Sequence, residues 1–538
     1  MKKIAALIGA LLIVVLVVHF SFANRQLNVV LITMDTTRAD FFSCYNPKAV
    51  KTPGLDRIAK KSMLFENAFS LIPITFPAHS SIFLSKTPHE MNVFNNGDFL
   101  KVNEPLLAEL LAKQGYHTGA FVSMAALKDF FGLAKGFGTY KETFRDLGRP
   151  YAYASEVNQF VFPWLEHEQN NRFFLWIHYS DPHFPYVPIG APADTQVSLN
   201  GELLDQLWIA KKERIQLEMS LQPGENKLEF QNMYKGGANR RTYFDYINLQ
   251  NQPGVEMKYG PEFEGEKRKL EKEHGPEQIN FFVGHGTMLL TNHNPAPVNA
   301  TVFLSGKVMF LPETVRERYG QELLFMDQEI GKLWDKLEDL KLRDKTIVVI
   351  TSDHGECIGE HGKIGHVFPL VQELVHVPLI VYYPGIGRSG RSKQLVNHMD
   401  IRPTILDLLH MQPTGNMEGQ SLKQYISWSP IDMIFGRRSD RIRTFCETYA
   451  PAGKADSYAV VENHMKLIQT KEVNGWSYEL YNLVKDPKEQ HNLAQDSSMQ
   501  PLLAEFAKEA EESHSHHKNP KLDEESKQML RDLGYIAQ

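Results

Sequence analysis

The sequence of 538 residues has few cysteines, no excess of basic residues and, beyond its N-terminus, no long apolar run. Cys44, Cys357 and Cys446 allow at most one disulfide, and their spacing fits no zinc motif. We expect buried or unreactive thiols, because free cysteine is usually buried. The net charge of -6 argues against a general nucleic-acid binder, which would carry a basic excess. What remains is an ordinary globular composition with 42% hydrophobic residues.

The N-terminus is the one strongly apolar region. Two lysines follow Met1, residues 4–22 are almost entirely apolar, and Ser21-Phe22-Ala23 resembles a cleavage site. This pattern predicts a secretory signal peptide over residues 1–23. The run also just reaches bilayer thickness, so a single uncleaved membrane anchor is the alternative. In both cases the catalytic part is exported, either to the periplasm or anchored facing the extracytoplasmic side.

Short apolar runs alternate with amphipathic segments along most of the chain. Strands that alternate with helices predict an α/β fold, with a mainly parallel sheet sandwiched by helices. The predicted strands are 28–34, 117–123, 173–178, 346–351 and 377–382, and the predicted helices are 106–115, 322–342 and 401–409.

The segment 189–311 breaks this rhythm, because apolar and polar residues alternate there between Gly and Pro turns. Such alternation is typical of half-buried antiparallel strands and predicts an inserted β-sandwich. After residue 446, strands at 458–461 and 465–468 precede a polar segment expected to be helical. A charged run at 265–275 and a His-rich tract at 513–517 are expected to be solvated. The predicted divisions are 1–23 (leader or anchor), 24–188 and 312–445 (catalytic domain), 189–311 (inserted β-rich domain) and 446–538 (C-terminal α+β subdomain).

Residues with metal-ligand chemistry follow three of the predicted strands. Asp35 follows the first strand, His178 and Asp181 end or follow the third, and Asp353-His354 follow the fourth. Each alone has an ordinary reading as a helix cap or a satisfied polar residue. Together they predict a divalent metal site at the carboxyl edge of the sheet. Asp and His together favour Zn or Mn, whereas a set dominated by carboxylates suits Ca or Mg.

A Pro-bounded turn at 73–81 places Thr75 near the start of a predicted helix. Free N–H groups at a helix N-terminus favour an anionic group. A metal can ionise a hydroxyl there, which can then attack an ester phosphorus or sulfur. The alternative is that Thr75 only caps the helix.

Several segments, in this order, resemble the sulfatase family within the alkaline-phosphatase superfamily. The matching segments are 28–40 (NVVLITMDTTRAD), 73–81, 111–123, 173–186 (FFLWIHYSDPHFPY), 346–361 (TIVVITSDHGECIGEH), 400–404, 479–493 and 530–536. The resemblance implies that Asp35, Asp353 and His354 bind the metal and that Thr75 is the nucleophile and a further ligand. It also implies that His183 contacts the transferred group, that His366 contacts phosphate or a second metal, and that Lys363 assists.

Three positions depart from the classical sulfatase pattern. Thr75 stands where Cys or Ser is converted to formylglycine, so no formylglycine is expected. His79 stands at the motif's Arg, and Thr36 replaces an Asp that is often a further calcium ligand. These departures resemble the phosphate-transferring branches and favour a zinc-like or manganese-like site.

The sequence therefore predicts an exported, metal-dependent hydrolase of sulfate or phosphate esters. Its substrate would be an ester on a glycan or a lipid headgroup, and no nucleic-acid partner is expected. Two alternatives stay open at this stage. One is a transferase that moves a phospho-headgroup onto an envelope lipid or glycan, and the other is an inactive glycan-binding relative.

Overall fold

The computed structural model describes residues 26–504, apart from gaps at 148, 185, 187–194, 208–214, 233–240, 251, 260–279, 284, 310–311, 367–369, 386, 413–414, 428–439, 449–455, 473–474 and 502. These residues form two compact units, one from Phe184 to Glu322 and the other from the remaining segments on either side. The predicted leader at 1–23, the charged run at 265–275 and the His-rich tract at 513–517 lie outside the described residues. In the part of the chain that is described, no helix is both long enough and apolar enough to cross a membrane.

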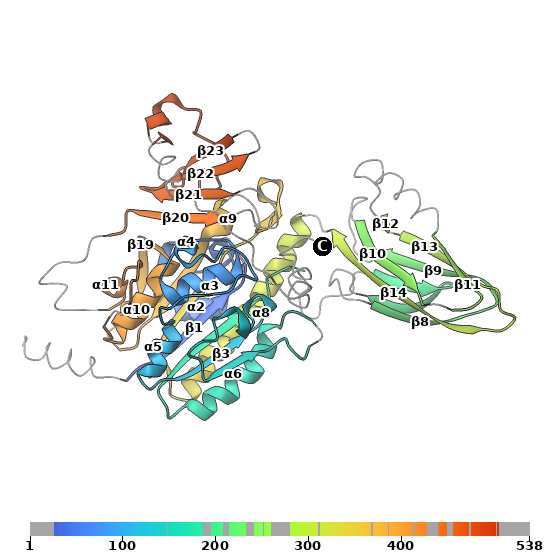
Figure 1. The fold of residues 1–538 in the computed structure, drawn as a ribbon, viewed down its shortest axis with the longest axis horizontal. Helices are drawn as coiled ribbons and strands as arrows, with labels where there is room; N and C mark the ends of the chain where they lie inside the picture. The colour runs from blue at the N-terminus through green and yellow to red at the C-terminus, as the bar shows by residue number, and fades with distance from the viewer. Residues whose placement is uncertain are drawn as a thin grey trace, which may run out of the picture. The chain divides into compact units, whose positions relative to one another are not determined.

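The larger unit is built on an eight-stranded sheet among the described residues (Figure 1). Its strands, in spatial order, are β19 (Gly390–Asn397), β2 (Met63–Phe69), β18 (His376–Tyr382), β15 (Thr346–Ser352), β1 (Asn28–Met34), β5 (Phe173–Tyr179), β3 (His117–Val122) and β4 (Thr139–Glu142). All residues of β1, β5 and β15 are buried, as expected for strands covered on both faces. The α/β fold predicted from the alternation of strands and helices is confirmed.

The five predicted strands are all present, but the direction of one was not predictable. β1 pairs in parallel with both β15 and β5, whereas β18 runs antiparallel to β15 and to β2. A continuous apolar run fits a buried strand of either direction, so the pattern at 377–382 carried no information about orientation. The sheet is accordingly mixed, with a parallel centre that carries the strand ends of interest.

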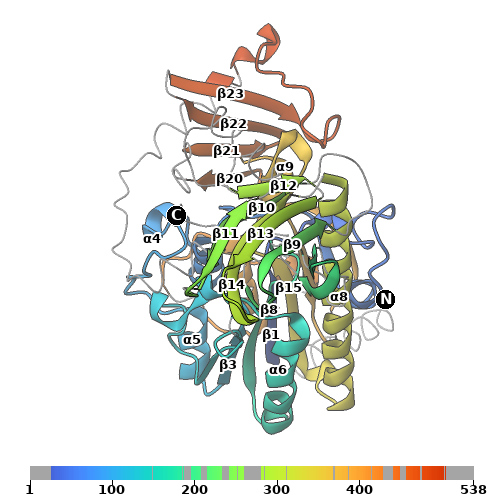
Figure 2. The same ribbon diagram turned by 90° about the vertical axis from the view of Figure 1, so that its right-hand side faces the viewer.

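Helices cover both faces of this sheet. They are α2 (Pro53–Ala59), α3 (Thr75–Leu84), α4 (Pro88–Met91), α5 (Leu107–Lys113), α6 (Ala154–Glu168), α8 (Pro312–Asp339), α9 (Gln372–Val375), α10 (Ile401–Leu408) and α11 (Lys423–Ile426). Figure 1 places α10 and α11 on one side of β1 and α6 and α8 on the other. Helix α6 lies beside the later part of α8 (Figure 2), where Asn158 Nδ2 donates to Glu329 Oε2 over 2.9 Å.

The smaller unit contains a nine-stranded sheet among the described residues. Its strands are β6 (Thr195–Leu199), β7 (Glu202–Leu207), β8 (Ile215–Leu221), β9 (Gly224–Asn232), β10 (Arg241–Leu249), β11 (Val255–Tyr259), β12 (Asn280–Val283), β13 (His285–Asn292) and β14 (Val298–Met309). The pairings in this sheet are antiparallel. In β8, Leu217, Met219 and Leu221 are buried while the residues between them are exposed, which is the alternation seen in the sequence. The division of the insert into two packed sheets stays a prediction.

A four-stranded antiparallel sheet completes the larger unit, with β20 (Arg443–Thr448), β21 (Ser457–Glu462), β22 (Met465–Glu472) and β23 (Gly475–Asn482) in that order. The expectation that the chain turns helical directly after residue 468 is wrong, because β23 pairs with β22 along its whole length. Within Gly475–Asn482 the apolar and aromatic residues Trp476, Tyr478 and Leu480 recur at every second position, which is typical of a strand.

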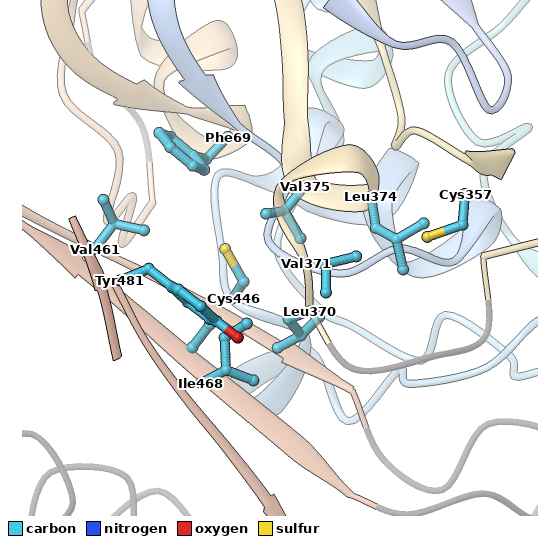
Figure 3. Packing of buried hydrophobic residues seen from close by; sticks show 11 residues of the cluster. Phe69, Cys357, Leu370, Val371, Leu374, Val375, Cys446, Val461, Ile468 and Tyr481 are labelled. Carbon is cyan, nitrogen blue, oxygen red and sulfur yellow. The ribbon is translucent and has the colours of Figure 1, made fainter. Parts of the chain in front are cut away.

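Buried apolar side chains join this small sheet to the main one (Figure 3). The cluster includes Phe69 of β2, Val371 and Leu374 near α9, and Ile468 of β22. All three cysteines are free thiols. Cys357 and Cys446 are buried and belong to this cluster, as expected for free thiols, and burial raises the pKa of Cys446 to about 12, which disfavours its reactive thiolate form.

Candidate active site

Two parallel neighbours in the main sheet bring the predicted metal ligands together. Strands β1 and β15 are in register from Asn28 opposite Thr346 to Met34 opposite Ser352, so the residues that follow them meet at one edge. Asp35, Asp353 and His354 are completely buried there. One ligand atom from each lies within 4.8 Å of the others.

Each of these three side chains has a polar atom that makes no hydrogen bond. The atoms are Oδ1 of Asp35, Oδ2 of Asp353 and Nε2 of His354. Their other polar atoms are occupied, since Asp353 Oδ1 accepts from the backbone N–H groups of Thr36 and His354 over 3.1 and 2.7 Å. Buried polar atoms without partners are costly, and two carboxylate oxygens with an imidazole nitrogen form a donor set that suits a divalent cation. The residues present therefore fit such an ion.

The two carboxyl groups differ in their electrostatic surroundings. Burial raises the pKa of Asp353 well above its ordinary value, and the nearby Asp35 carboxylate adds to this. Burial alone would also raise the pKa of Asp35, but the contact with His178 and the charge of His183 outweigh it, so that this pKa is lowered. Burial and the neighbouring His366 lower the pKa of His354 to about 3, which keeps its imidazole neutral and able to bind metal.

Thr75 is the first residue of α3, which begins beside this cluster. Its Oγ1 lies 3.5 Å from Oδ2 of Asp35. The N-cap of α3 is Ile74, whose side chain cannot accept a hydrogen bond, and the N–H of Phe76 is satisfied by Asn96 Oδ1 over 2.8 Å. The alternative reading of Thr75 as the helix cap is therefore wrong, and its hydroxyl points to the ligand cluster.

Two further predicted residues, His183 and His366, lie close to this cluster. The ring centroids of His354 and His366 are 4.6 Å apart, and those of His366 and His183 are 5.6 Å apart. His183 and His366 are both buried, and His366 Nδ1 lies 3.2 Å from Oε1 of Glu356. Lys363 lies half-buried between the short strands β16 (Cys357–Ile358) and β17 (Ile364–Gly365), and its assisting role stays a prediction.

His178, one of the strand-end residues with metal-ligand chemistry in the sequence, contacts the cluster directly. Its Nε2 lies 3.4 Å from Asp35 Oδ2, while its Nδ1 is 2.8 Å from the hydroxyl of Ser123 at the end of β3. The Ser123 hydroxyl in turn donates to Ser180 Oγ over 2.8 Å. This chain of contacts fixes the orientation of the ring that faces Asp35.

Arg38 was missed by sequence reasoning. Its buried guanidinium donates to Asp40 over 2.9 and 2.8 Å, to Glu360 Oε1 over 2.8 Å and to the carbonyl of Glu356 over 3.2 Å. It thereby ties the loop after β1 to the segment that carries His366. Its last two partners lie more than three hundred residues away in the chain, so no local signal could have identified it.

Comparison with known proteins decides the family. The family model for sulfatases matches residues 27–411, which include every site residue described above. This chain belongs to the sulfatase family. A second model, for the C-terminal region of N-sulphoglucosamine sulphohydrolase, matches residues 359–516.

Curated relatives of this sulfatase-family chain are named as sulfatases. An N-acetylglucosamine-6-O-sulfatase of Bacteroides thetaiotaomicron is 22% identical over 93% of this chain and 88% of its own length. An arylsulfatase of Clostridium perfringens is 23% identical over 87% of this chain and 90% of its own length.

Solved structures match the fold over nearly the whole chain. A protein solved in complex with its substrate D-glucosamine-2-N,6-O-disulfate has a TM-score of 0.60 at 18% identity, covering 91% of this chain and 98% of its own. The phosphonate monoester hydrolase of Agrobacterium radiobacter has a TM-score of 0.59 at 19% identity, covering 91% of this chain and 96% of its own. This sulfatase-family protein is accordingly a hydrolase that acts on sulfuric or phosphoric ester bonds.

Proposed function

We propose that this sulfatase-family hydrolase depends on a divalent metal, uses Thr75 as its nucleophile and acts outside the cytoplasm. The observation that carries the proposal is the position of the Thr75 hydroxyl, 3.5 Å from Asp35 Oδ2 beside buried ligand atoms that make no hydrogen bonds. The ligands would be Asp35, Thr75, Asp353 and His354. Zn or Mn is favoured by the histidine and by Thr36 in place of a further carboxylate, and Ca or Mg is the alternative.

A cation held there would lower the pKa of the Thr75 hydroxyl and offset negative charge on the ester group. The Thr75 oxygen then attacks phosphorus or sulfur, the bond to the alcohol breaks, and the group is transferred to Thr75. His183 and His366, whose ring centroids are 5.6 Å apart, would donate hydrogen bonds to the non-bridging oxygens of that group. Water attacks the resulting Thr75 ester, which releases the anion and restores the hydroxyl.

The substrate is proposed to be an ester on a glycan or lipid headgroup, with phosphate preferred over sulfate. A hydroxyl nucleophile lacks the second geminal oxygen through which formylglycine hydrate ejects sulfate. The group on Thr75 must leave by direct attack at its central atom, and this route is better suited to a phosphoryl group held by histidines and a cation.

A comparison of matched aryl phosphate and aryl sulfate esters with each of the four metals tests this preference. We expect kcat/KM to favour the phosphate by at least about tenfold. Mass spectrometry of trapped enzyme should place the transferred group on residue 75. A clear preference for sulfate would refute the argument from the threonine, and the family assignment would stand.

Replacing Thr75 by Ala tests the nucleophile itself. Turnover should fall by roughly 10³-fold or more, as on removal of other covalent nucleophiles, because no other group takes the transferred phosphoryl. Thermal unfolding should change little and most of the metal should stay bound. Near-wild-type turnover of the Ala variant would remove Thr75 from the mechanism.

Export is proposed from the apolar N-terminal run at residues 1–23. Expression of the full chain in a bacterial host, followed by fractionation and N-terminal sequencing, tests it. Activity outside the cytoplasm is expected, with a mature start near Asn24 for a signal peptide or an intact Met1 in the membrane fraction for an anchor. Soluble cytoplasmic enzyme that retains Met1 would contradict export.

A further inference from the structure

His79 lies one helical turn after Thr75 and connects the start of α3 to β1. The ring is completely buried. Its Nδ1 lies 2.7 Å from the backbone carbonyl of Thr75, and its Nε2 lies 2.9 Å from the hydroxyl of Thr33. Thr33 precedes Asp35 by two residues on the strand that ends in the ligand cluster. A single side chain therefore bridges the turn that carries the hydroxyl of Thr75 and the strand that carries Asp35.

The hydrogen-bond network assigns the proton on this ring. A carbonyl oxygen only accepts, so Nδ1 carries the hydrogen and donates to Thr75. On the other side, the indole N–H of Trp176 donates to the Thr33 hydroxyl over 2.9 Å, and an indole N–H cannot accept. The Thr33 hydroxyl is then free to donate its own hydrogen to Nε2. The result is a series of three hydrogen bonds that all donate in one direction. Trp176 donates to Thr33, Thr33 donates to His79, and His79 donates to the carbonyl of Thr75.

The surroundings of the ring hold it in place, because none of it is exposed to solvent. The ring is also enclosed by aromatic neighbours, with centroid distances of 5.0 Å to His178 and 5.4 Å to Trp176. Together with the two hydrogen bonds, these contacts hold the ring in one orientation.

We propose that His79 is a positioning residue that holds the Thr75 carbonyl, and through it the Thr75 hydroxyl, toward Asp35. The proposal rests on the nucleophilic role of Thr75 proposed above. Thr75 is the first residue of α3, and in the proposed mechanism its hydroxyl must lie close to the reacting atom. A small displacement there lowers the rate of the chemical step much more than it lowers substrate binding.

The competing reading is a buried histidine that contributes to stability alone. Two conservative substitutions distinguish a positioning role from a purely stabilising one, because each places an amide near the position of a different ring nitrogen. In H79N the amide lies near the position of Nδ1 and can still donate to Thr75, although it no longer reaches Thr33. In H79Q the amide extends toward the position of Nε2, which keeps the contact with Thr33 and gives up the one with Thr75.

The test measures kcat, KM, metal content and thermal unfolding of the full-length wild type, H79N, H79Q and T33V on the aryl phosphate. We expect kcat of H79Q to fall by roughly tenfold to a hundredfold with KM nearly unchanged and the metal retained. H79N should keep most of the wild-type kcat, and T33V should fall between them because it leaves the ring less well oriented. H376Q is the control, since His376 is a half-buried histidine whose Nε2 likewise contacts a backbone carbonyl, that of Glu66 over 2.8 Å, which belongs to no residue of the site.

The control should lose stability without losing kcat per folded molecule. Equal kcat in H79N and H79Q, whether high or low, would overturn the proposal, because the bond to the Thr75 carbonyl would then not be what matters. Losses of kcat that follow the loss of stability in all variants, H376Q included, would overturn it as well. A fully active T75A would instead refute the proposed function, so the two failures are distinguishable.

Discussion

Replacing Asp353 by Asn is expected to stabilise the metal-free protein and to abolish its stabilisation by metal. Asp353 and Asp35 are both completely buried, and their ligand atoms lie within 4.8 Å of each other. A cation between them offsets their charges, whereas in its absence they repel. The substitution removes one charge and keeps the shape of the side chain. Its amide oxygen can still accept from the N–H groups of Thr36 and His354.

The size of the effect follows from this geometry. Two unit charges at that separation repel by about 3.5 kcal/mol at an effective dielectric constant of about 20. Part of the gain is lost because the new amide N–H₂ needs acceptors, for which Asp35 Oδ1 is available. We therefore expect the free energy of unfolding in chelator at neutral pH to rise by about 1 to 3 kcal/mol.

The pH dependence has a definite sign. The folded-state pKa of Asp353 is raised, so the folded protein holds a proton that the unfolded chain has already released. The free energy of unfolding of the metal-free wild type should therefore fall as pH rises from the ordinary pKa of an aspartate to the raised pKa of folded Asp353. It should stay low at pH values above that raised pKa. The Asn variant cannot lose this proton, so its advantage should grow with pH over that window.

Urea unfolding in chelator at several pH values, repeated with added Zn or Mn, measures both effects. Metal should raise the unfolding midpoint of the wild type and leave that of the Asn variant unchanged. Asp327→Asn is the control, because Asp327 is a buried carboxyl whose pKa burial raises to about 6 and whose oxygens accept from the N–H groups of Gly54 and Leu55 over 2.9 and 2.7 Å. That variant should be destabilised and respond normally to metal. A destabilised, metal-responsive Asp353→Asn protein would refute the reasoning.

Replacing His354 by Ala should remove metal and esterase activity together, because it takes away the only nitrogen donor among the proposed ligands. Elemental analysis showing undiminished metal would contradict its assignment as a ligand. Replacing Lys466 by Met should lower the free energy of unfolding by about 3 to 5 kcal/mol, because Glu489 would be left buried and unpaired. That ion pair spans 2.7 Å with both side chains fully buried, so a loss as small as that from breaking the exposed pair of Arg57 and Asp335 would contradict the prediction. The excised segment 184–322 should fold by itself, and a random-coil circular dichroism spectrum would count against an independent core.

Much of the larger unit could be predicted because its signals are local. The apolar runs at Asn28–Met34, Phe173–Tyr179 and Thr346–Ser352 are long enough and β-branched enough to specify buried strands. The residues that follow a parallel strand necessarily reach the carboxyl edge of the sheet, so Asp35 and Asp353 were expected to meet before their register was known. Strand β23 shows the limit of this reasoning, since most of its residues are only partly buried and the alternation of apolar and polar residues is short.

The sequence alone determined which side chains could carry the chemistry, because strand length and ligand type are properties of short segments. Only the tertiary structure decided how those side chains are held. Three features depend on segments that are distant in the chain. They are the antiparallel pairing of β18 with β15, the contacts of Arg38 with Glu356 and Glu360, and the hydrogen bond between His79 and Thr33. Such contacts depend on strand register and on the packing of α3 against the sheet. Periodicity specifies that a face is buried and leaves open which partner it will meet.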